Sequence, residues 1–318
     1  MTVVRVCTIG APSDYKTSLI PAICRSLGYE ISWVKPQNAD LIIAGPFNNR
    51  NIKSLAWCPK PLRPSFSKIN EIIQLAYASR QSKPPVLFQT GENLRCDYMP
   101  HDFSITFDLG VSAPNHFRMP YWMEMVDWSK DGVTGNLNPR YGCLLSLDRL
   151  LQPLGNEFLS RPLQAAIFAS HLREPRQTLL GAVKKQIEVI EYGRSFNPNI
   201  KNHLESGIVK FKELQKVAFN LCPENGMYPG YYTEKIPEAF MAGCLPITWV
   251  DENVQIDFNP KAFINLAPMS LDYFSDLENI LNSKNRLLSY SEQALLLERP
   301  SIEPLKNFVK EIFKKTIS

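Results

Sequence analysis

The chain has 318 residues, of which 44% are hydrophobic and 21% are charged, and a net charge of +4 from 35 basic and 31 acidic residues. This composition excludes a disordered or fibrous protein, and because the two signs are mixed along the chain, it also excludes the dense basic face of a nucleic-acid-binding protein. The length allows one large core or two ordinary ones, and the mild positive balance suits a small anionic ligand.

Short apolar segments recur through the first half of the chain, each followed by turn residues and then a helical pattern. Their hydrophobicity is continuous rather than alternating, which indicates strands buried on both faces, as in a parallel sheet. A helix is expected over 15–30, between the first two segments. The segments lie at 3–10, 39–47, 84–93 and 103–109.

A polar stretch rich in turn residues, from about 125 to 160, places a domain boundary near residue 155. Apolar segments then resume at 163–170, 187–193, 217–225, 244–250 and 261–268. Strands that alternate with helices indicate right-handed crossovers in an open sheet, whose ligands bind beyond the carboxyl ends of the strands. The pattern therefore predicts two α/β domains, 1–155 and 156–300, with a cleft between them.

The last segment, 301–318, predicts an amphipathic helix with lysines on its polar face. Packing of its apolar face on the body of the protein is the preferred interpretation, and contact of its basic face with a membrane surface is the alternative. The apolar residues are Leu305, Phe308, Val309, Ile312 and Phe313.

Signals for secretion or membrane insertion are missing from the sequence. The first apolar run is too short for a signal peptide, and no window approaches the roughly 18 uninterrupted apolar residues of a membrane span. The seven cysteines are odd in number and scattered, without the spacing of a zinc site. We therefore expect reduced thiols in a cytoplasmic protein, located at most at the inner face of the membrane.

The loop between the apolar segments at 217–225 and 244–250 contains residues suited to binding an anionic ligand. Thr233 is the expected N-cap of the following helix, and Gly243 its expected end. Lys235 falls in the first turn, where the helix dipole disfavours a cation unless an anion compensates, and Gly226 and Gly230 let the backbone approach a ligand. These features predict a diphosphate here. The alternative is a well-capped helix whose neighbouring tyrosines only fill space.

Two common phosphate-binding motifs are absent. No GxGxxG follows an expected strand, and GxxxxGK[ST] does not occur. Their absence argues against dinucleotide enzymes and P-loop ATPases.

The segment FNLCPENGMYPGYYTEKIPEAFMAGCLPITW, at 219–249, together with DFNPKAFIN at 257–265, resembles the donor-binding signature of the α-1,3/4-fucosyltransferases. This family inverts the sugar configuration and uses GDP-fucose, and the resemblance is closest to its bacterial members. Segments at 87–93, 101–109 and 165–180 are similar to other parts of the family, in the same order. The resemblance implies a GT-B architecture, with an N-terminal acceptor-binding domain and a C-terminal GDP-sugar-binding domain.

The same resemblance implies roles for individual residues. Glu92 matches the general base, which takes a proton from the acceptor hydroxyl as that hydroxyl attacks the anomeric carbon. Arg176 and Lys235 match the basic residues that hold the diphosphate and stabilise the charge on the leaving group. Tyr231 and Glu234 match residues that line the donor, with Glu234 near the ribose or the positively charged sugar ring.

Further matches concern the loops around the donor. Glu224 and Asn225 match positions that contact it, and Tyr192 and Gly193 match a turn near the nucleotide. Each of these polar residues has a purely structural alternative, and Arg176 has the alternative of an ordinary surface arginine.

The expected reaction transfers fucose to a hydroxyl of a GlcNAc-containing oligosaccharide, in α-1,3 linkage. GDP-fucose acts as donor substrate, no cofactor is expected to be tightly bound, and a divalent cation is expected only as a stimulating, non-structural ion. His101, His116, His171 and His203 are scattered and form no ligand set with nearby acids, so no metal site is expected. Nucleic acid is not an expected partner.

Two alternatives stay open at this point. One is a GT-B enzyme with another GDP-sugar or reaction, since Met227, Tyr228 and Pro229 stand where relatives often carry small or charged residues. The other is a sugar-nucleotide binding protein without transferase activity.

Overall fold

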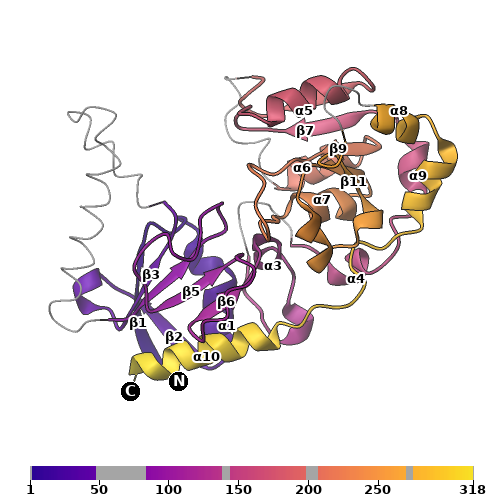
Figure 1. Ribbon diagram of the computed structural model, residues 1–318. Helices are drawn as coiled ribbons and strands as arrows, with labels where there is room; N and C mark the ends of the chain where they lie inside the picture. The colour runs from indigo at the N-terminus through magenta and orange to yellow at the C-terminus, as the bar shows by residue number, and fades with distance from the viewer. Residues whose placement is uncertain (1, 48–83, 138–143, 198–206, 270–274, 318) are drawn as a thin grey trace, which may run out of the picture. The chain divides into compact units, whose positions relative to one another are not determined.

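The computed structural model describes residues 2–47, 84–137, 144–197, 207–269 and 275–317 (Figure 1). Two compact units make up the chain. The first comprises Met1–Glu124, Trp128–Asn136 and Ser301–Ser318, and the second Met125–Asp127 and Leu137–Pro300. The units thus divide the chain differently from the expected boundary near residue 155, because the segment from Leu137 onward belongs with the second sheet and the terminal helix with the first.

A six-stranded parallel sheet forms the core of the first unit, in the order β2-β1-β3-β4-β5-β6. The four predicted strands are confirmed as β1 (Thr2–Ile9), β3 (Leu41–Ala44), β4 (Val86–Gln89) and β5 (Phe103–Thr106). Two strands were not predicted, β2 (Tyr29–Trp33) and β6 (His116–Arg118). Both are edge strands without a fully buried residue, so they lack the continuous apolar signature.

The helix expected over 15–30 is shorter than predicted. A 3₁₀ turn at Tyr15–Thr17 precedes α1 (Leu19–Ser26), and the chain turns through Gly28, whose φ of 84° suits glycine, into β2. A short helix, α3 (Tyr121–Glu124), and a 3₁₀ turn at Ser129–Asp131 follow the last strand.

The C-terminal helix α10 (Glu303–Ile317) packs against the first unit (Figure 1). Its residues Leu305, Val309, Ile312 and Phe313 are buried. The ring of Phe308 lies 5.5 Å from that of Phe117 and 6.5 Å from that of Phe103. The preferred interpretation of this helix, packing of its apolar face on the body of the protein, is therefore confirmed.

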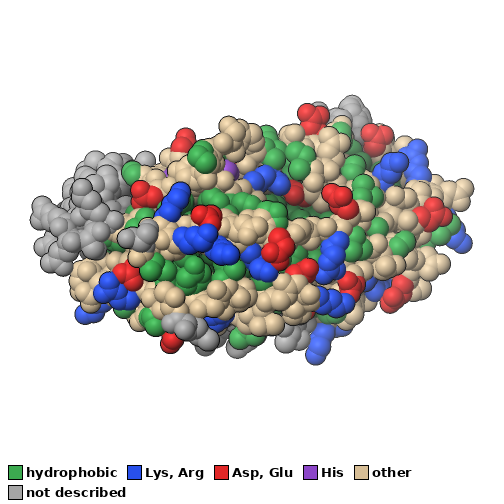
Figure 2. All heavy atoms as spheres, turned by 90° about the horizontal axis from the view of Figure 1, so that it is seen from below, with side chains coloured by type: hydrophobic (Ala, Val, Ile, Leu, Met, Phe, Trp, Pro, Cys, Tyr) green, Lys and Arg blue, Asp and Glu red, His purple; other side chains and the backbone are tan. Residues whose placement is uncertain are grey.

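Charges of both signs are interspersed on the face that Figure 2 shows, rather than gathered into one basic region. On α10, Lys306 and Lys314 pair with acidic residues one turn earlier, Glu303 and Glu311. Among the described residues, no helix is both long and apolar enough to cross a membrane.

A five-stranded parallel sheet forms the core of the second unit, in the order β11-β10-β9-β7-β8. All five predicted strands are confirmed, as β7 (Ala165–Phe168), β8 (Val189–Tyr192), β9 (Phe219–Leu221), β10 (Leu245–Thr248) and β11 (Ile264–Asn265). The helices are α4 (Leu147–Leu150), α5 (Arg176–Val183), α6 (Gly207–Leu214), α7 (Lys235–Met241), α8 (Ser275–Leu281) and α9 (Lys284–Ser291). Because the strands are parallel, the loops after β7 and β9 leave the same edge of the sheet.

Candidate functional site

Arg176 connects the two loops at the carboxyl edge of the second sheet. It is the first residue of α5 and is only 7% exposed. Its Nη2 donates to Asn225 Oδ1 and, at 3.4 Å, to the carbonyl oxygen of Pro223. Its Nη1 donates to the carbonyl oxygen of His171 at 3.5 Å. The alternative of an ordinary surface arginine is therefore wrong.

The charge of Arg176 has no direct counter-ion among the described residues. All three of its hydrogen bonds go to neutral oxygen atoms, and no described carboxylate lies within ion-pair distance. Burial lowers the pKa of its guanidinium, whereas the more distant Glu224, Tyr231 and Glu234 act to raise it. A buried cation without a close partner is costly, so this position favours the arrival of an anion.

Glu224 organises the loop that follows β9. Its side chain is 1% exposed, and its Oε1 accepts hydrogen bonds of 2.8 Å from both the backbone N–H and the hydroxyl of Thr233. Its Oε2 accepts one of 2.8 Å from Nζ of Lys235. Thr233 was the predicted N-cap of α7, and this prediction is wrong. The helix begins at Lys235 with Glu234 in the cap position, and the Thr233 side chain binds Glu224 instead.

Lys235 therefore has an internal anion beside it. Burial acts to lower its pKa, but Glu224 and then Glu234 outweigh that effect and hold the pKa well above its usual value. The amine is thus fully charged at neutral pH. Gly243, with φ of 76°, follows the end of α7 as predicted. The helix has only seven residues, so its dipole contributes little and the side-chain cations dominate the site.

Glu234 is 6% exposed, with a carboxylate oxygen 4.0 Å from Nζ of Lys235. Burial alone would raise its pKa, but Lys235 and Lys210 outweigh burial and lower it, so the group is ionised. One turn further along α7, Glu238 forms a buried ion pair with Lys210 of α6. Neither Lys210 nor Glu238 was predicted. The spacing of Glu238 from Glu234 was a readable signal, whereas Lys210 comes from a different helix.

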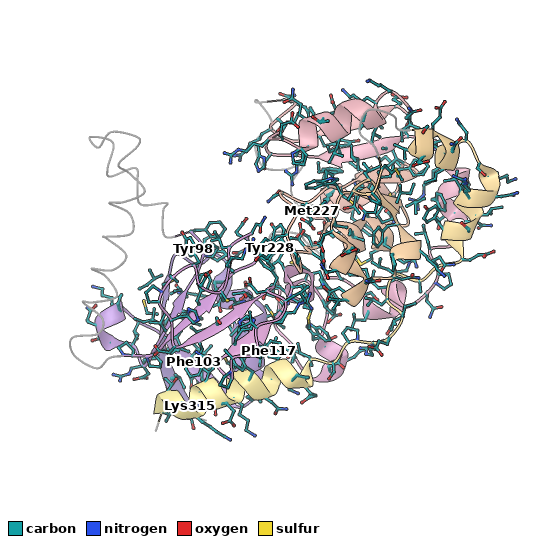
Figure 3. The ribbon with its side chains drawn as sticks, viewed as in Figure 1. Tyr98, Phe103, Phe117, Met227, Tyr228 and Lys315 are labelled. Carbon is teal, nitrogen blue, oxygen red and sulfur yellow. The ribbon has the colours of Figure 1, made fainter. Side chains whose placement is uncertain are left out.

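Tyr231 is 3% exposed, and its N–H donates to the carbonyl oxygen of Tyr228 at 3.0 Å. Its hydroxyl is close enough to act on the pKa of both Arg176 and Lys235. By contrast, Met227 and Tyr228 at the tip of the loop are 38% and 39% exposed (Figure 3). The two ends of the loop are thus buried and charged, whereas its tip, Met227 and Tyr228, is exposed and carries no charge.

Tyr192 and Gly193 end β8 with well-defined structural contacts. The ring of Tyr192 stacks on Phe168 at 4.6 Å, and its hydroxyl donates to Glu213 at 2.9 Å. Burial and then Glu213 raise the pKa of this hydroxyl to about 12. Gly193 has φ of 106°, and a Cβ there would lie 2.3 Å from the carbonyl oxygen of Ala169. The structural alternative accounts for both residues, and a nucleotide contact stays a prediction.

Glu92 lies in the first unit, on the loop after β4. Its N–H donates to the hydroxyl of Thr90 at 3.0 Å, and its carbonyl accepts from the N–H of Leu94 at 2.7 Å. The loop is held further on by Asp108, which accepts from the N–H of Cys96 at 2.9 Å. The partly exposed Glu92 carboxylate forms no hydrogen bond or ion pair with another described residue, so it is available to a ligand.

Beneath this loop lies a buried chain of polar side chains that was not predicted. Gln89, the last residue of β4, accepts a hydrogen bond of 2.5 Å from the hydroxyl of Tyr15 and donates one of 3.4 Å to Glu124. The second carboxylate oxygen of Glu124 accepts from the N–H of Leu19 at 2.8 Å, at the start of α1. Burial raises the pKa of Glu124 to about 7, against the opposing effect of these hydrogen bonds.

The described histidines His101 and His116 bind groups of the protein itself. Nδ1 of His101 lies 2.8 Å from the carbonyl oxygen of Met99, and that of His116 lies 2.9 Å from the hydroxyl of Ser104. His171 follows β7, and His203 falls outside the described residues. In the part of the chain that the structure describes, no group of three or more His, Cys, Asp or Glu residues could hold a metal ion.

Comparison with known sequences finds one family for the second unit. Residues 160–292 match the family described as glycosyltransferase family 10 (fucosyltransferase) C-term. An alpha-(1,3)-fucosyltransferase, FucT, of Helicobacter pylori is 27% identical over 257 residues, which cover 72% of this chain and 52% of the relative. The chain therefore spans about half the length of the curated relative that it matches.

Comparison with solved structures shows the fold. A crystal structure of an alpha1,3-fucosyltransferase has a TM-score of 0.68 at 20% identity and covers 99% of this chain and 90% of its own. A second crystal structure, of an alpha1,3-fucosyltransferase with GDP-fucose, has a TM-score of 0.66 at 21% identity, with coverage of 99% and 91%. The predicted α/β class, with two parallel sheets in a GT-B fold, is confirmed.

Proposed function

We propose, from the match of residues 160–292 to the fucosyltransferase C-terminal domain of glycosyltransferase family 10, that the protein is an inverting α-1,3-fucosyltransferase. It would move L-fucose from GDP-β-L-fucose to a hydroxyl of a GlcNAc-containing glycan. The observation that carries the proposal is Arg176, a buried guanidinium with only neutral hydrogen-bond partners among the described residues. A diphosphate supplies the negative charge that this position lacks.

The proposed site accelerates transfer by stabilising negative charge on the leaving group. As the glycosidic bond of the donor breaks, negative charge grows on the departing GDP. Arg176 and Lys235 are held in place before the reaction, by Asn225 and by Glu224 respectively. Because they need not reorganise, they stabilise the transition state more than the ground state. This is the electrostatic work that a metal ion does in other enzymes.

Glu92 is the proposed general base. Its carboxylate takes the proton of the acceptor hydroxyl as the oxygen attacks the anomeric carbon from the face opposite GDP, which inverts the configuration. The absence of a hydrogen bond to the Glu92 carboxylate within the described residues supports this role, because a base must be free to meet its substrate. Such a group contributes about 10²- to 10⁴-fold to the rate.

Residues of the donor loop have proposed roles beside the two cations. The ionised Glu234 would accept hydrogen bonds from the ribose or stabilise positive charge on the sugar ring. Tyr231 and Asn225 would line the donor, and Tyr192 and Gly193 would lie near the nucleotide. The exposed Met227 and Tyr228 belong to the same loop, so the identity of the donor sugar is part of the test.

Product analysis tests the proposal. The protein is incubated with a panel of GDP- and UDP-sugars and an N-acetyllactosamine acceptor, with and without EDTA, and the products are identified by mass spectrometry. A fucosylated acceptor from GDP-fucose is the expected result. Transfer of a different sugar would identify another GT-B transferase, and binding of GDP-fucose without transfer or hydrolysis would identify a binding protein without activity.

A further inference from the structure

We infer that Lys210 is a positioning residue of the donor site, which pairs with Glu238 and so leaves the carboxylate of Glu234, one helical turn away, to act on the donor. The inference rests on the proposed function, because it assigns Lys210 the task of controlling the charge of Glu234. It concerns a residue on α6, outside the donor loop.

The geometry pairs one lysine with a carboxylate that lies one helical turn after Glu234. Nζ of Lys210 forms an ion pair with Oε2 of Glu238, and the two side chains are 14% and 12% exposed. Glu238 lies one helical turn after Glu234, and its N–H donates to the carbonyl oxygen of Glu234 at 2.8 Å. Side chains with this spacing share one face of a helix.

Two buried carboxylates on one face repel each other, and one of them binds a proton unless a cation intervenes. Burial, the largest effect, raises the pKa of Glu238 overall, while Lys210 acts to lower it and Glu234 acts to raise it. Lys235 and Lys210 together lower the pKa of Glu234 against burial.

The other charged groups that face this cluster cannot replace Lys210. Lys210 interacts electrostatically with Glu238, Glu234 and Lys235, and also with the buried thiol of Cys222. Arg176 interacts with Glu234 as well, but its guanidinium is held by Asn225. Lys235 is held at 2.8 Å by Glu224 and lies 4.0 Å from Glu234, so its charge is already shared between two carboxylates. Lys210 is thus the cation that directly neutralises Glu238 and leaves Glu234 free to act on the donor.

The test is the pH profile of kcat/KM for GDP-fucose. In Lys210→Met, one of the two carboxylates takes up a proton at a higher pH, so the acid limb of the profile should move upward. If the acid limb shifts by one pH unit, kcat/KM falls about tenfold at acidic pH. On the plateau at higher pH, kcat/KM changes less. The double variant Lys210→Met/Glu238→Gln removes the competing carboxylate and should return the acid limb toward the wild-type position.

Two controls separate this role from a merely structural one. Lys210→Arg keeps the charge and should keep the profile, and Lys216→Met removes an exposed lysine near the end of α6 and should not move the limb. If Lys210→Met does not fold, the acid limb is compared among three other variants instead. These are Lys210→Gln/Glu238→Gln, Lys210→Arg and Glu238→Gln. Equal loss at every pH in Lys210→Met, or a shifted limb that persists in the double variant, would overturn the inference. If wild-type protein does not turn over GDP-fucose, the proposed function fails instead.

Discussion

Nζ of Lys235 lies 2.8 Å from Oε2 of Glu224, a carboxylate that is only 1% exposed. Each partner compensates a charge that burial would otherwise make costly. Removing one partner of such a pair typically costs about 3–5 kcal/mol, because the other charge is left alone in the interior. Lys235 therefore stabilises the loop, and its proposed second role is to present charge to the diphosphate, so a test of the second role has to preserve the first.

Replacing the whole pair separates the two roles. In Lys235→Met/Glu224→Gln, the buried ion pair is removed as a unit, Glu234 keeps Lys210 as a neighbouring cation, and the proposed phosphate contact is lost. We expect the affinity for GDP to fall by about 10- to 100-fold, as for a charged hydrogen bond worth roughly 1.5–3 kcal/mol, with little change for guanosine. Isothermal titration calorimetry measures both, with Lys216→Met as a control. Equal losses for GDP and guanosine would mean that Lys235 does not face the diphosphate.

Glu92→Gln should abolish most of the activity without impairing the donor site, because Glu92 lies in the first unit and Arg176 and Lys235 lie in the second. We expect kcat to fall by about 10²- to 10⁴-fold, with GDP affinity unchanged. The matched control is Asp97→Asn, an exposed acid near the same loop. A variant of Glu92 that turns over as fast as wild type would exclude its assignment as base.

Glu124 makes stability depend on pH. Its pKa is about 7 in the folded protein against 4.5 for the free group, so its stabilising contribution is complete below about pH 4.5 and is lost as the pH rises through 7. The difference corresponds to about 3 kcal/mol at 1.36 kcal/mol per pH unit. Glu124→Gln should flatten the decline in the free energy of unfolding between pH 5 and pH 8, measured by urea denaturation. The exposed Glu30→Gln should leave it unchanged, and an equal decline in both variants would contradict the assignment.

Two glycines of the second unit should respond oppositely to alanine. At Gly193, φ is 106° and the new Cβ would lie 2.3 Å from a carbonyl oxygen, so Gly193→Ala should destabilise the protein by roughly 3 kcal/mol. Gly181 is in α5, where a Cβ would meet no other atom within 4 Å, so Gly181→Ala should stabilise the protein by about 0.5–1 kcal/mol. Thermal unfolding of both variants checks this. Similar melting temperatures would contradict the close approach at Gly193.

The central strands could be predicted because each carries its own signal. A strand such as β3 is buried at every residue, and a continuous apolar run shows this directly in the sequence. The edge strand β2 is only partly buried, and its composition resembles a loop. Thr233 was misassigned because the hydroxyl of a threonine before a helix can either cap the helix or bind another side chain. Only the folded loop brings the Glu224 carboxylate within reach of that hydroxyl.

The candidate site was predictable where its residues lie on one loop and not where they come together from distant elements. Glu224, Glu234 and Lys235 fall within one continuous segment. Lys210 meets Glu238 across 28 positions, and Glu124 meets the backbone of Leu19 across 105. No local periodicity encodes such contacts, because they depend on how strands and helices are packed.

A crystal structure of the complex with GDP would show whether Arg176 and Lys235 bind the diphosphate. We expect both phosphates within hydrogen-bond distance of Arg176 and Lys235, at the carboxyl edge of the second sheet. Phosphates bound elsewhere, beyond hydrogen-bond distance of both Arg176 and Lys235, would contradict this assignment.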